Sequence, residues 1–155
     1  RDTRPMPAFA GGGTVVFPPG TYLSSSIRLL SHVTLHIEKD ATLLGSPVRT
    51  GYQKAHFYAL IVAEGQTNIG IRGQGTINGN GKLLAADTQR LADEGVLPNA
   101  EEGNRPLIIN FRRCRNVTIR DLTLRDSAIR MKTEGRTNRP PATMPPQVRC
   151  ISQPM

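Results

Sequence analysis

The chain has 155 residues, enough for one domain, and its 20 Lys and Arg against 12 Asp and Glu give a net charge of +8. This excess favours polyanionic partners such as nucleic acid, anionic lipid or acidic polysaccharide, and the sign of the charge does not choose among them. Aromatic residues make up only 5% of the sequence and are not interleaved with basic ones, unlike the surfaces that bind single-stranded nucleic acid. No apolar run reaches the roughly 18–20 residues of a membrane-spanning helix. We therefore expect neither nucleic acid nor a membrane as a partner.

The first part of the chain has the pattern of short strands separated by turns. Residues 1–10 hold two prolines and show no periodicity, which predicts a disordered segment. Residues 14–17 are β-branched or aromatic and lie between a glycine cluster and a Pro-Pro-Gly turn, which predicts a strand. Apolar and polar residues alternate over 23–29 and again over 33–37, so we expect two further strands there.

One sequence pattern recurs along the chain. Residues 68–81 begin Asn-Ile-Gly-Ile-Arg, residues 116–127 begin Asn-Val-Thr-Ile-Arg, and residues 32–37 form a looser copy. Each copy is too small to bury its own apolar side chains, so the copies are expected to stack as coils. The pattern predicts an all-β fold, a right-handed parallel β-helix, of which this chain contains a few N-terminal coils. The unequal spacing of the copies indicates insertions between them.

Two groups of residues in these copies are expected to have structural roles. Asn68 and Asn116 open equivalent copies, so their amides are expected to stack as a buried ladder that bonds from one coil to the next. Gly73, Gly75 and Gly79 lie within the first full copy, where glycine permits a sharp turn or the close approach of another backbone.

The coils are expected to occupy residues 11–128. Within them, residues 80–106 interrupt the pattern: helix formers over 82–97 predict a short surface helix, and a turn-rich linker follows. Residues 129–155 carry prolines and scattered arginines without the repeat, which predicts a disordered tail. A β-helix that ends in an open coil exposes unpaired strand backbone, so we expect either a monomer or a chain prone to aggregation.

Two groups of side chains raise the possibility of a binding site. His32 and His36 would lie about 13 Å apart on a strand that rises about 3.3 Å per residue. That separation is too large for one ion, so we predict no metal site. Arg120 and Arg125 either face a groove, where they would bind carboxylates through paired hydrogen bonds, or lie on a solvated outer face.

The repeated segments, together with residues 11–22, resemble the N-terminal coils of polygalacturonase-type glycoside hydrolases (family 28). The opening Gly-Gly-Gly-Thr-Val-Val-Phe-Pro-Pro-Gly-Thr-Tyr is shared with other β-helices of the pectin-lyase-like fold, whereas Gly-Gln-Gly-Thr-Ile-Asn-Gly-Asn-Gly at 73–81 is more specific to family 28. The resemblance covers residues 11–128. It implies hydrolysis of galacturonan or a related pectic polysaccharide, with inversion and without a metal or other cofactor. It also implies a secreted or periplasmic location.

The catalytic part of the family pattern does not occur in the sequence. Family members carry Asn-Thr-Asp, Asp-Asp and Gly-His-Gly on later coils, and none of these motifs is present here. Inverting hydrolysis needs two carboxyl groups about 6.5–9.5 Å apart. No catalytic residue can be nominated, because the aspartates are all isolated in the sequence: Asp2, Asp40, Asp87, Asp93, Asp121 and Asp126.

A short segment after the last copy has a different resemblance. Residues 129–132 read Ile-Arg-Met-Lys and resemble the family's Arg-Ile-Lys motif, which implies that Arg130 and Lys132 bind a substrate carboxylate. In the family this motif follows the catalytic coils. An internal deletion would place it this early, and so would a frameshift that produces the match by chance.

Three functions remain open at this point. The first is a fragment of a pectic polysaccharide hydrolase that is catalytically silent by itself, since it lacks the carboxylate pair. The second is a non-catalytic β-helix whose basic surface binds an acidic polysaccharide. The third is a structural β-helix, which would form trimers. The first agrees best with the motifs.

Overall fold

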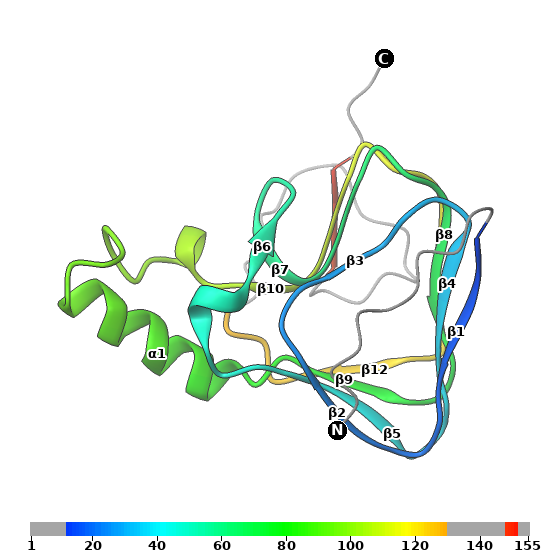
Figure 1. Ribbon diagram of the computed structural model, residues 1–155, viewed down its shortest axis with the longest axis horizontal. Coiled ribbons are helices and arrows are strands. Elements are labelled where there is room, and N and C mark those ends of the chain that lie inside the picture. Colours follow the sequence, from blue (N-terminus) through cyan, green and yellow to red (C-terminus); the bar gives the residue numbers. More distant parts are fainter. Residues whose placement is uncertain (1–11, 130–147, 152–155) are drawn as a thin grey trace, which may run out of the picture.

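The computed structural model describes residues 12–129 and 148–151. These residues form four coils, and each coil contributes one strand to each of three sheets (Figure 1). The first sheet contains β1 (Gly13–Phe17), β4 (Val33–Ile37), β8 (Thr67–Arg72) and β11 (Arg115–Ile119). The second sheet contains β2 (Gly20–Ser24), β5 (Ala41–Gly45), β9 (Thr76–Asn78) and β12 (Thr123–Arg125). The third sheet contains β3 (Ile27–Arg28), β7 (Tyr58–Glu64), β10 (Leu107–Arg112) and β13 (Val148–Ile151).

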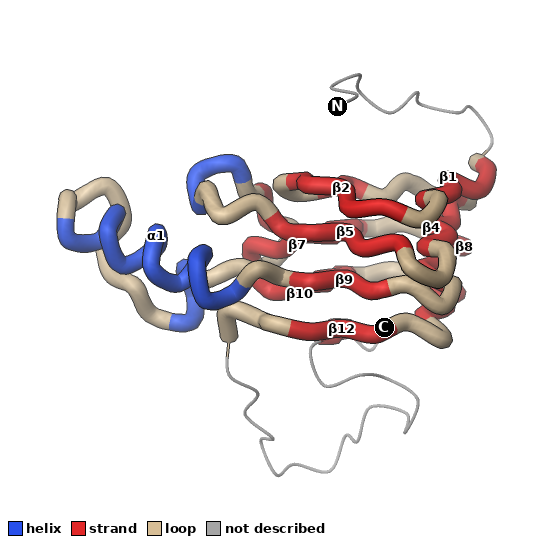
Figure 2. Tube along the Cα trace, turned by 90° about the horizontal axis from the view of Figure 1, so that it is seen from below, coloured by secondary structure: helices blue, strands red, loops and turns tan. Residues whose placement is uncertain are grey.

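Strands of successive coils run parallel, and their register follows the sequence repeat. Thr34 lies opposite Gly70, and Ile69 lies opposite Val117. Equivalent residues in these coils are therefore 36 and 48 positions apart, as in the aligned copies of the sequence. Figure 2 shows the strands of the second sheet stacked one above another along the axis of the coils. The prediction of an all-β parallel β-helix is confirmed.

The interior consists of ladders of apolar side chains that run from coil to coil. In the first sheet one ladder comprises Val15, Leu35, Ile71 and Ile119. In the second sheet another comprises Tyr22, Leu43, Ile77 and Leu124. The members in the two middle coils are completely buried, whereas those in the first and fourth coils are only partly buried. Each coil therefore depends on the coils above and below it to remove its apolar surface from water.

One strand predicted from the sequence is in fact two. Residues 23–29 alternate, but the structure has a corner between β2 and β3. Tyr22 packs edge-on against Phe17, with ring centroids 5.3 Å apart, while Leu23 is 54% exposed. The alternation does not reveal the corner, because a turn of two residues preserves a period of two.

Two insertions interrupt the coils between the second sheet and the third, one between β5 and β7 and the other between β9 and β10. The first contains the 3-10 helix η1 (Arg49–Gly51) and the short strand β6 (Gln53–Lys54), which pairs antiparallel with β7. The second contains α1 (Gly81–Asp93) and the 3-10 helix η2 (Glu102–Asn104). Both helical elements of the second insertion fall within residues 80–106, where the sequence pattern is interrupted. Figure 1 shows α1 projecting away from the three sheets.

Helix α1 buries one face against the first insertion. Leu84, Thr88 and Leu91 are buried, and their spacing places them on the same side of the helix. The helix ends at Asp93 rather than at the predicted residue 97, because Gly95 adopts a left-handed conformation with φ of 78°, which terminates helices. No helix in the described part of the chain is long and apolar enough to cross a membrane.

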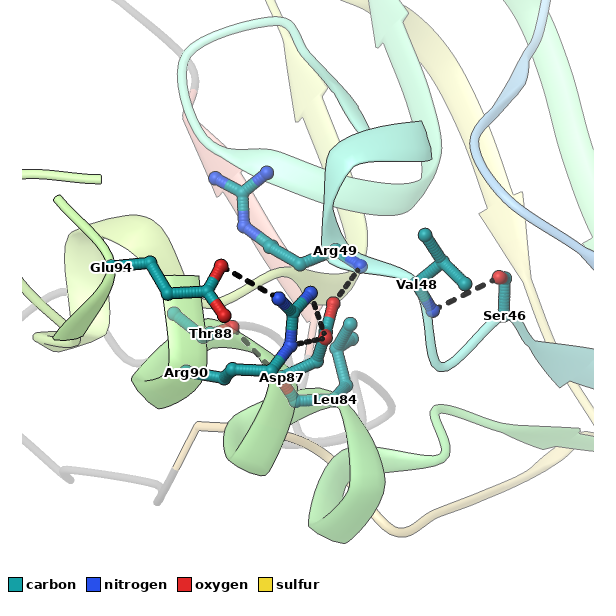
Figure 3. A network of polar contacts seen from close by, with 8 residues as sticks. All are labelled: Ser46, Val48, Arg49, Leu84, Asp87, Thr88, Arg90 and Glu94. Carbon is teal, nitrogen blue, oxygen red and sulfur yellow. Dashed lines mark hydrogen bonds and ion pairs between the residues drawn. The ribbon is translucent and has the colours of Figure 1, made fainter. Parts of the chain in front are cut away.

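A network of polar contacts fastens α1 to η1 (Figure 3). The carboxylate of Asp87 accepts a hydrogen bond from the backbone N–H of Arg49 at 2.8 Å and pairs with Arg90 at 2.9 Å. Arg90 in turn pairs with Glu94 at 2.8 Å. The hydrogen bond from Arg49, supported by those from Arg90, holds the pKa of Asp87 below its usual value.

The lowered pKa of Asp87 predicts that docking of α1 is sensitive to acid. A carboxyl group with a depressed pKa in the folded state contributes stability above its unfolded pKa, about 3.9 for Asp, and loses it as the pH falls through the folded value. We expect the Tm of the wild-type chain to fall more steeply below about pH 4 than the Tm of Asp87→Asn, which has no such group to protonate. Thermal melts followed by circular dichroism across this pH range provide the measurement.

Asp93→Asn is the matched control for this prediction. Asp93 also lies on α1, but it is exposed and accepts one hydrogen bond from Gln89 at 2.9 Å. The Tm of Asp93→Asn should therefore fall with pH as steeply as the Tm of the wild-type chain. If the Tm of Asp87→Asn fell as steeply with decreasing pH as the Tm of the wild-type chain, the proposed role of Asp87 would be wrong.

Candidate functional site

Arg130 and Lys132, for which the family resemblance implies substrate binding, lie outside the described residues. The asparagines, glycines, histidines and other arginines considered as site residues lie within the coils.

Asn68 and Asn116 lie one above the other at the start of β8 and β11. The side-chain amide of Asn116 donates a hydrogen bond to the side-chain oxygen of Asn68, and the amide of Asn68 donates to Nδ1 of His32 at 3.1 Å. The three residues have left-handed backbones, with φ of 67° for His32, 56° for Asn68 and 53° for Asn116, a conformation that Asn and His adopt more readily than most residues.

This ladder differs from the predicted one in its position. Asn68 and Asn116 are exposed, so the prediction of a buried ladder is wrong. The residues that follow them, Ile69 and Val117, pack against the core, and the left-handed corner leaves the two amides on the outside. His32 also lies at this corner rather than within a strand, and it adds a third member to the ladder.

Gly73, Gly75 and Gly79 lie where the backbone of another coil comes close. A β-carbon on Gly73 would overlap the carbonyl oxygen of Ile37, and one on Gly75 would lie 2.6 Å from the carbonyl oxygen of Glu38. A β-carbon on Gly79 would lie 2.7 Å from a carbonyl oxygen of the fourth coil. Since packed interiors have no spare volume, a larger residue at any of the three positions would push neighbouring coils apart.

A column of basic side chains lies on the outer face of the first sheet. His36, Arg72 and Arg120 occupy equivalent positions in three successive coils. Adjacent strands of a sheet lie about 4.8 Å apart, so the backbones of Arg72 and Arg120 are close neighbours. Neither group forms a hydrogen bond or an ion pair with another described residue. In addition, Nε of Arg72 and Nδ1 of His36 are buried without a hydrogen-bond partner.

A hollow of about 320 Å³ lies beside this column. Its lining includes Gly70, whose neighbours in the adjacent coils, Thr34 and Thr118, also line it. Among the described residues, the charged groups that line the hollow are Arg72 and Arg120, and no carboxylate does. The neutral polar side chains in its lining are those of Thr34, Asn68, Asn116 and Thr118.

A second hollow of about 350 Å³ lies next to the first and shares Arg72 and Arg120 with it. Here the two arginines are accompanied by Lys39 and by two carboxylates, Glu38 and Asp121. The two hollows therefore differ in charge: the first presents cations alone, and the second is mixed.

The sequence identified this surface only in part. Arg120 lines both hollows, whereas Arg125 lies on β12 in the second sheet. A left-handed corner at Asp121, with φ of 65°, turns the chain between the two arginines, so they do not share a face. Arg72 was not singled out, although the match of Ile71-Arg72 with Ile119-Arg120 in the two copies places it beside Arg120.

The carboxylates of the described residues are dispersed over the fold. Asp87 and Glu94 pair with Arg90, and Glu64 pairs with Arg112 at 3.3 Å. Three aspartates occupy left-handed corners: Asp40, Asp121 and Asp126. No group of side chains in this part of the chain could hold a metal ion.

A comparison with known protein families shows the family to which this β-helix belongs. The sequence profile of glycosyl hydrolases family 28 matches residues 14–136, which is most of the chain. The chain belongs to glycosyl hydrolase family 28. The matched residues include the corner glycines, the exposed ladder and the basic column.

Solved structures show the same relationship for this family 28 chain. A protein of Parabacteroides merdae described as a glycosyl hydrolase is 35% identical, with a TM-score of 0.73 over 76% of this chain and 53% of the other. A family 28 exopolygalacturonase of Yersinia enterocolitica is 25% identical, with a TM-score of 0.71 over 78% of this chain and 30% of the enzyme. A polygalacturonase of Erwinia carotovora is 26% identical, with a TM-score of 0.58 over 74% of this chain and 35% of the enzyme.

The family 28 chain is shorter than these relatives. It spans about half the length of the Parabacteroides merdae protein and about a third of the length of the two polygalacturonases. No curated protein sequence matches it.

Proposed function

We propose that this chain forms the N-terminal coils of a polygalacturonase-type glycoside hydrolase that cleaves galacturonan in pectic polysaccharide. The observation that carries the proposal is the match to family 28 over residues 14–136, on a chain folded as a parallel β-helix. Two of the similar solved structures are named as polygalacturonases, which supports galacturonan as the substrate. Since pectic polysaccharide is a cell-wall polymer, a secreted or periplasmic place of action belongs to the same proposal.

We infer further that the 155-residue chain does not hydrolyse galacturonan by itself. An inverting hydrolase needs a protonated carboxyl group at the leaving oxygen and a carboxylate that activates water, about 6.5–9.5 Å away. Several carboxylates of the described coils are instead held in ion pairs with Arg90 and Arg112 or at left-handed corners. The pKa of Asp87 is lowered, which is the opposite of what a general acid requires.

The test is an assay of reducing ends released from polygalacturonate. We expect the purified chain to release no more than buffer does, while a known polygalacturonase assayed in parallel gives a full signal. Activity that follows the chain through successive chromatographic fractions would contradict the inference that it is silent.

The DNA that flanks the coding region provides a second test. Translation in all three frames is expected to reveal Asn-Thr-Asp, Asp-Asp and Gly-His-Gly beyond the fourth coil, and the longer protein should hydrolyse polygalacturonate with inversion. If that longer protein is folded but leaves polygalacturonate intact, the proposal of a pectic substrate is wrong.

A further inference from the structure

The two arginines of the basic column on the first sheet form no ion pair with a described residue, although Glu38 and Asp121 line the second hollow beside them. Arg72 and Arg120 lie at neighbouring positions one coil apart, and like charges placed opposite each other on a sheet are destabilising. Neither guanidinium group bonds to a described residue, and Nε of Arg72 is buried without an acceptor. A buried donor that lacks an acceptor is unfavourable. Both observations indicate that an anion would stabilise this pair of arginines.

The hollow at Gly70 supplies the space for such an anion. It spans three coils, since Thr34, Gly70 and Thr118 lie opposite one another, and it therefore extends along the axis of the β-helix. An extended polymer lying along this axis would pass Arg72 in one coil and Arg120 in the next.

The lining of the hollow favours a sugar polymer. Its neutral polar side chains, two threonines and two asparagines, can donate to and accept from sugar hydroxyl groups. No aromatic side chain among the described residues lines it, so a nucleic-acid base would have no surface on which to stack. A guanidinium group binds a carboxylate through two parallel hydrogen bonds. The chemistry thus fits a polysaccharide that carries carboxylates.

We propose that this hollow is a binding site for the uronate carboxylates of an acidic polysaccharide, with Arg72 and Arg120 each receiving one carboxylate. The two arginines bind and orient the chain and take no part in bond cleavage. The choice of a uronate rests on the proposed function, whereas the presence of an anion site on this face rests on the unpaired arginines.

The test measures the binding of oligogalacturonate to the 155-residue chain by titration calorimetry, at low and at physiological salt. The double variant Arg72→Gln/Arg120→Gln removes both charges from the hollow, and we expect it to weaken binding about tenfold or more, because bonds to charged groups are the strong ones. The double variant Lys82→Gln/Arg125→Gln removes the same charge from exposed positions on α1 and β12 and is expected to change the Kd less than about twofold. Far-UV circular dichroism verifies that all proteins are folded.

Each outcome decides the proposal. Wild-type affinity in Arg72→Gln/Arg120→Gln would overturn it, and so would an equal loss in the control variant, which would indicate only a general attraction to a basic protein.

Methyl-esterified oligogalacturonate keeps the sugar and lacks the charge, and it should not bind measurably. A single-stranded DNA oligonucleotide of equal charge should bind more weakly; tighter DNA binding that is lost in Arg72→Gln/Arg120→Gln would overturn the assignment to a uronate. Because none of these measurements requires cleavage, they remain decisive even if the longer protein proves to have no hydrolase activity.

Discussion

Gly73→Ala is expected to lower the free energy of unfolding of the β-helix by about 3 kcal/mol or more. This loss is the sum of the cost of a left-handed backbone at alanine and the cost of overpacking the interior. Gly73 has φ of 112°, a conformation that residues with a side chain rarely adopt. Its β-carbon would also overlap the carbonyl oxygen of Ile37, which is backbone and cannot rotate away. Gly73 lies at the corner between β8 and β9, so the strain would separate two coils that share one interior. Urea unfolding followed by circular dichroism measures the loss.

Gly65→Ala separates the two causes. Gly65 also has a left-handed backbone, with φ of 66°, but no atom lies within 4 Å of the position where its β-carbon would be placed. We expect Gly65→Ala to cost about 1 kcal/mol, which is the conformational part alone. A third variant, Gly103→Ala, has open space and no left-handed backbone, and its free energy of unfolding should match that of the wild-type chain. Equal effects of Gly73→Ala and Gly65→Ala would show that the close approach to Ile37 has no energetic consequence.

Arg49→Ala is the second substitution with a large expected effect. Arg49 is only 3% exposed, and its guanidinium group lies 3.8 Å from the centre of the Tyr58 ring. Its Nε donates a hydrogen bond to the carbonyl oxygen of Asn104 at 2.5 Å, which connects the first insertion to the second. Loss of the hydrogen bond from a charged group and of the contact with the ring is expected to cost about 3 kcal/mol. Urea unfolding of the variant provides the measurement.

Arg49→Met tests how much of this effect arises from packing. Methionine retains a long apolar side chain over Tyr58 but cannot bond to Asn104, so it should recover part of the stability that alanine loses. Arg28→Ala is the control: Arg28 is exposed on β3, and its contacts at 3.4 Å and 3.5 Å should contribute less than about 0.5 kcal/mol. An Arg49→Ala variant as stable as Arg28→Ala would contradict the role assigned to Arg49.

The parallel β-helix was predictable from the sequence because its coils repeat. Asn68 and Asn116 open two copies of one pattern, and the structure places those copies in the register that the alignment predicts. Strands β8 and β11 also alternate between apolar and small or polar residues, so the sequence indicated which of their side chains form the ladders of the interior, Ile71 and Ile119 among them. The family followed from the same segments.

The tertiary structure decided what happens at the corners and on the outer faces. Alternation continues through a short turn, so it concealed the corner between β2 and β3. A left-handed residue at Asp121 sends Arg125 to a different sheet from Arg120, although the two are five positions apart in one basic segment. Arg49 is buried where two insertions meet beside Tyr58 of β7. The corners depend on the backbone conformation of single residues, and the burial of Arg49 depends on contacts between insertions. The alternation of apolar and polar residues contains no information about either.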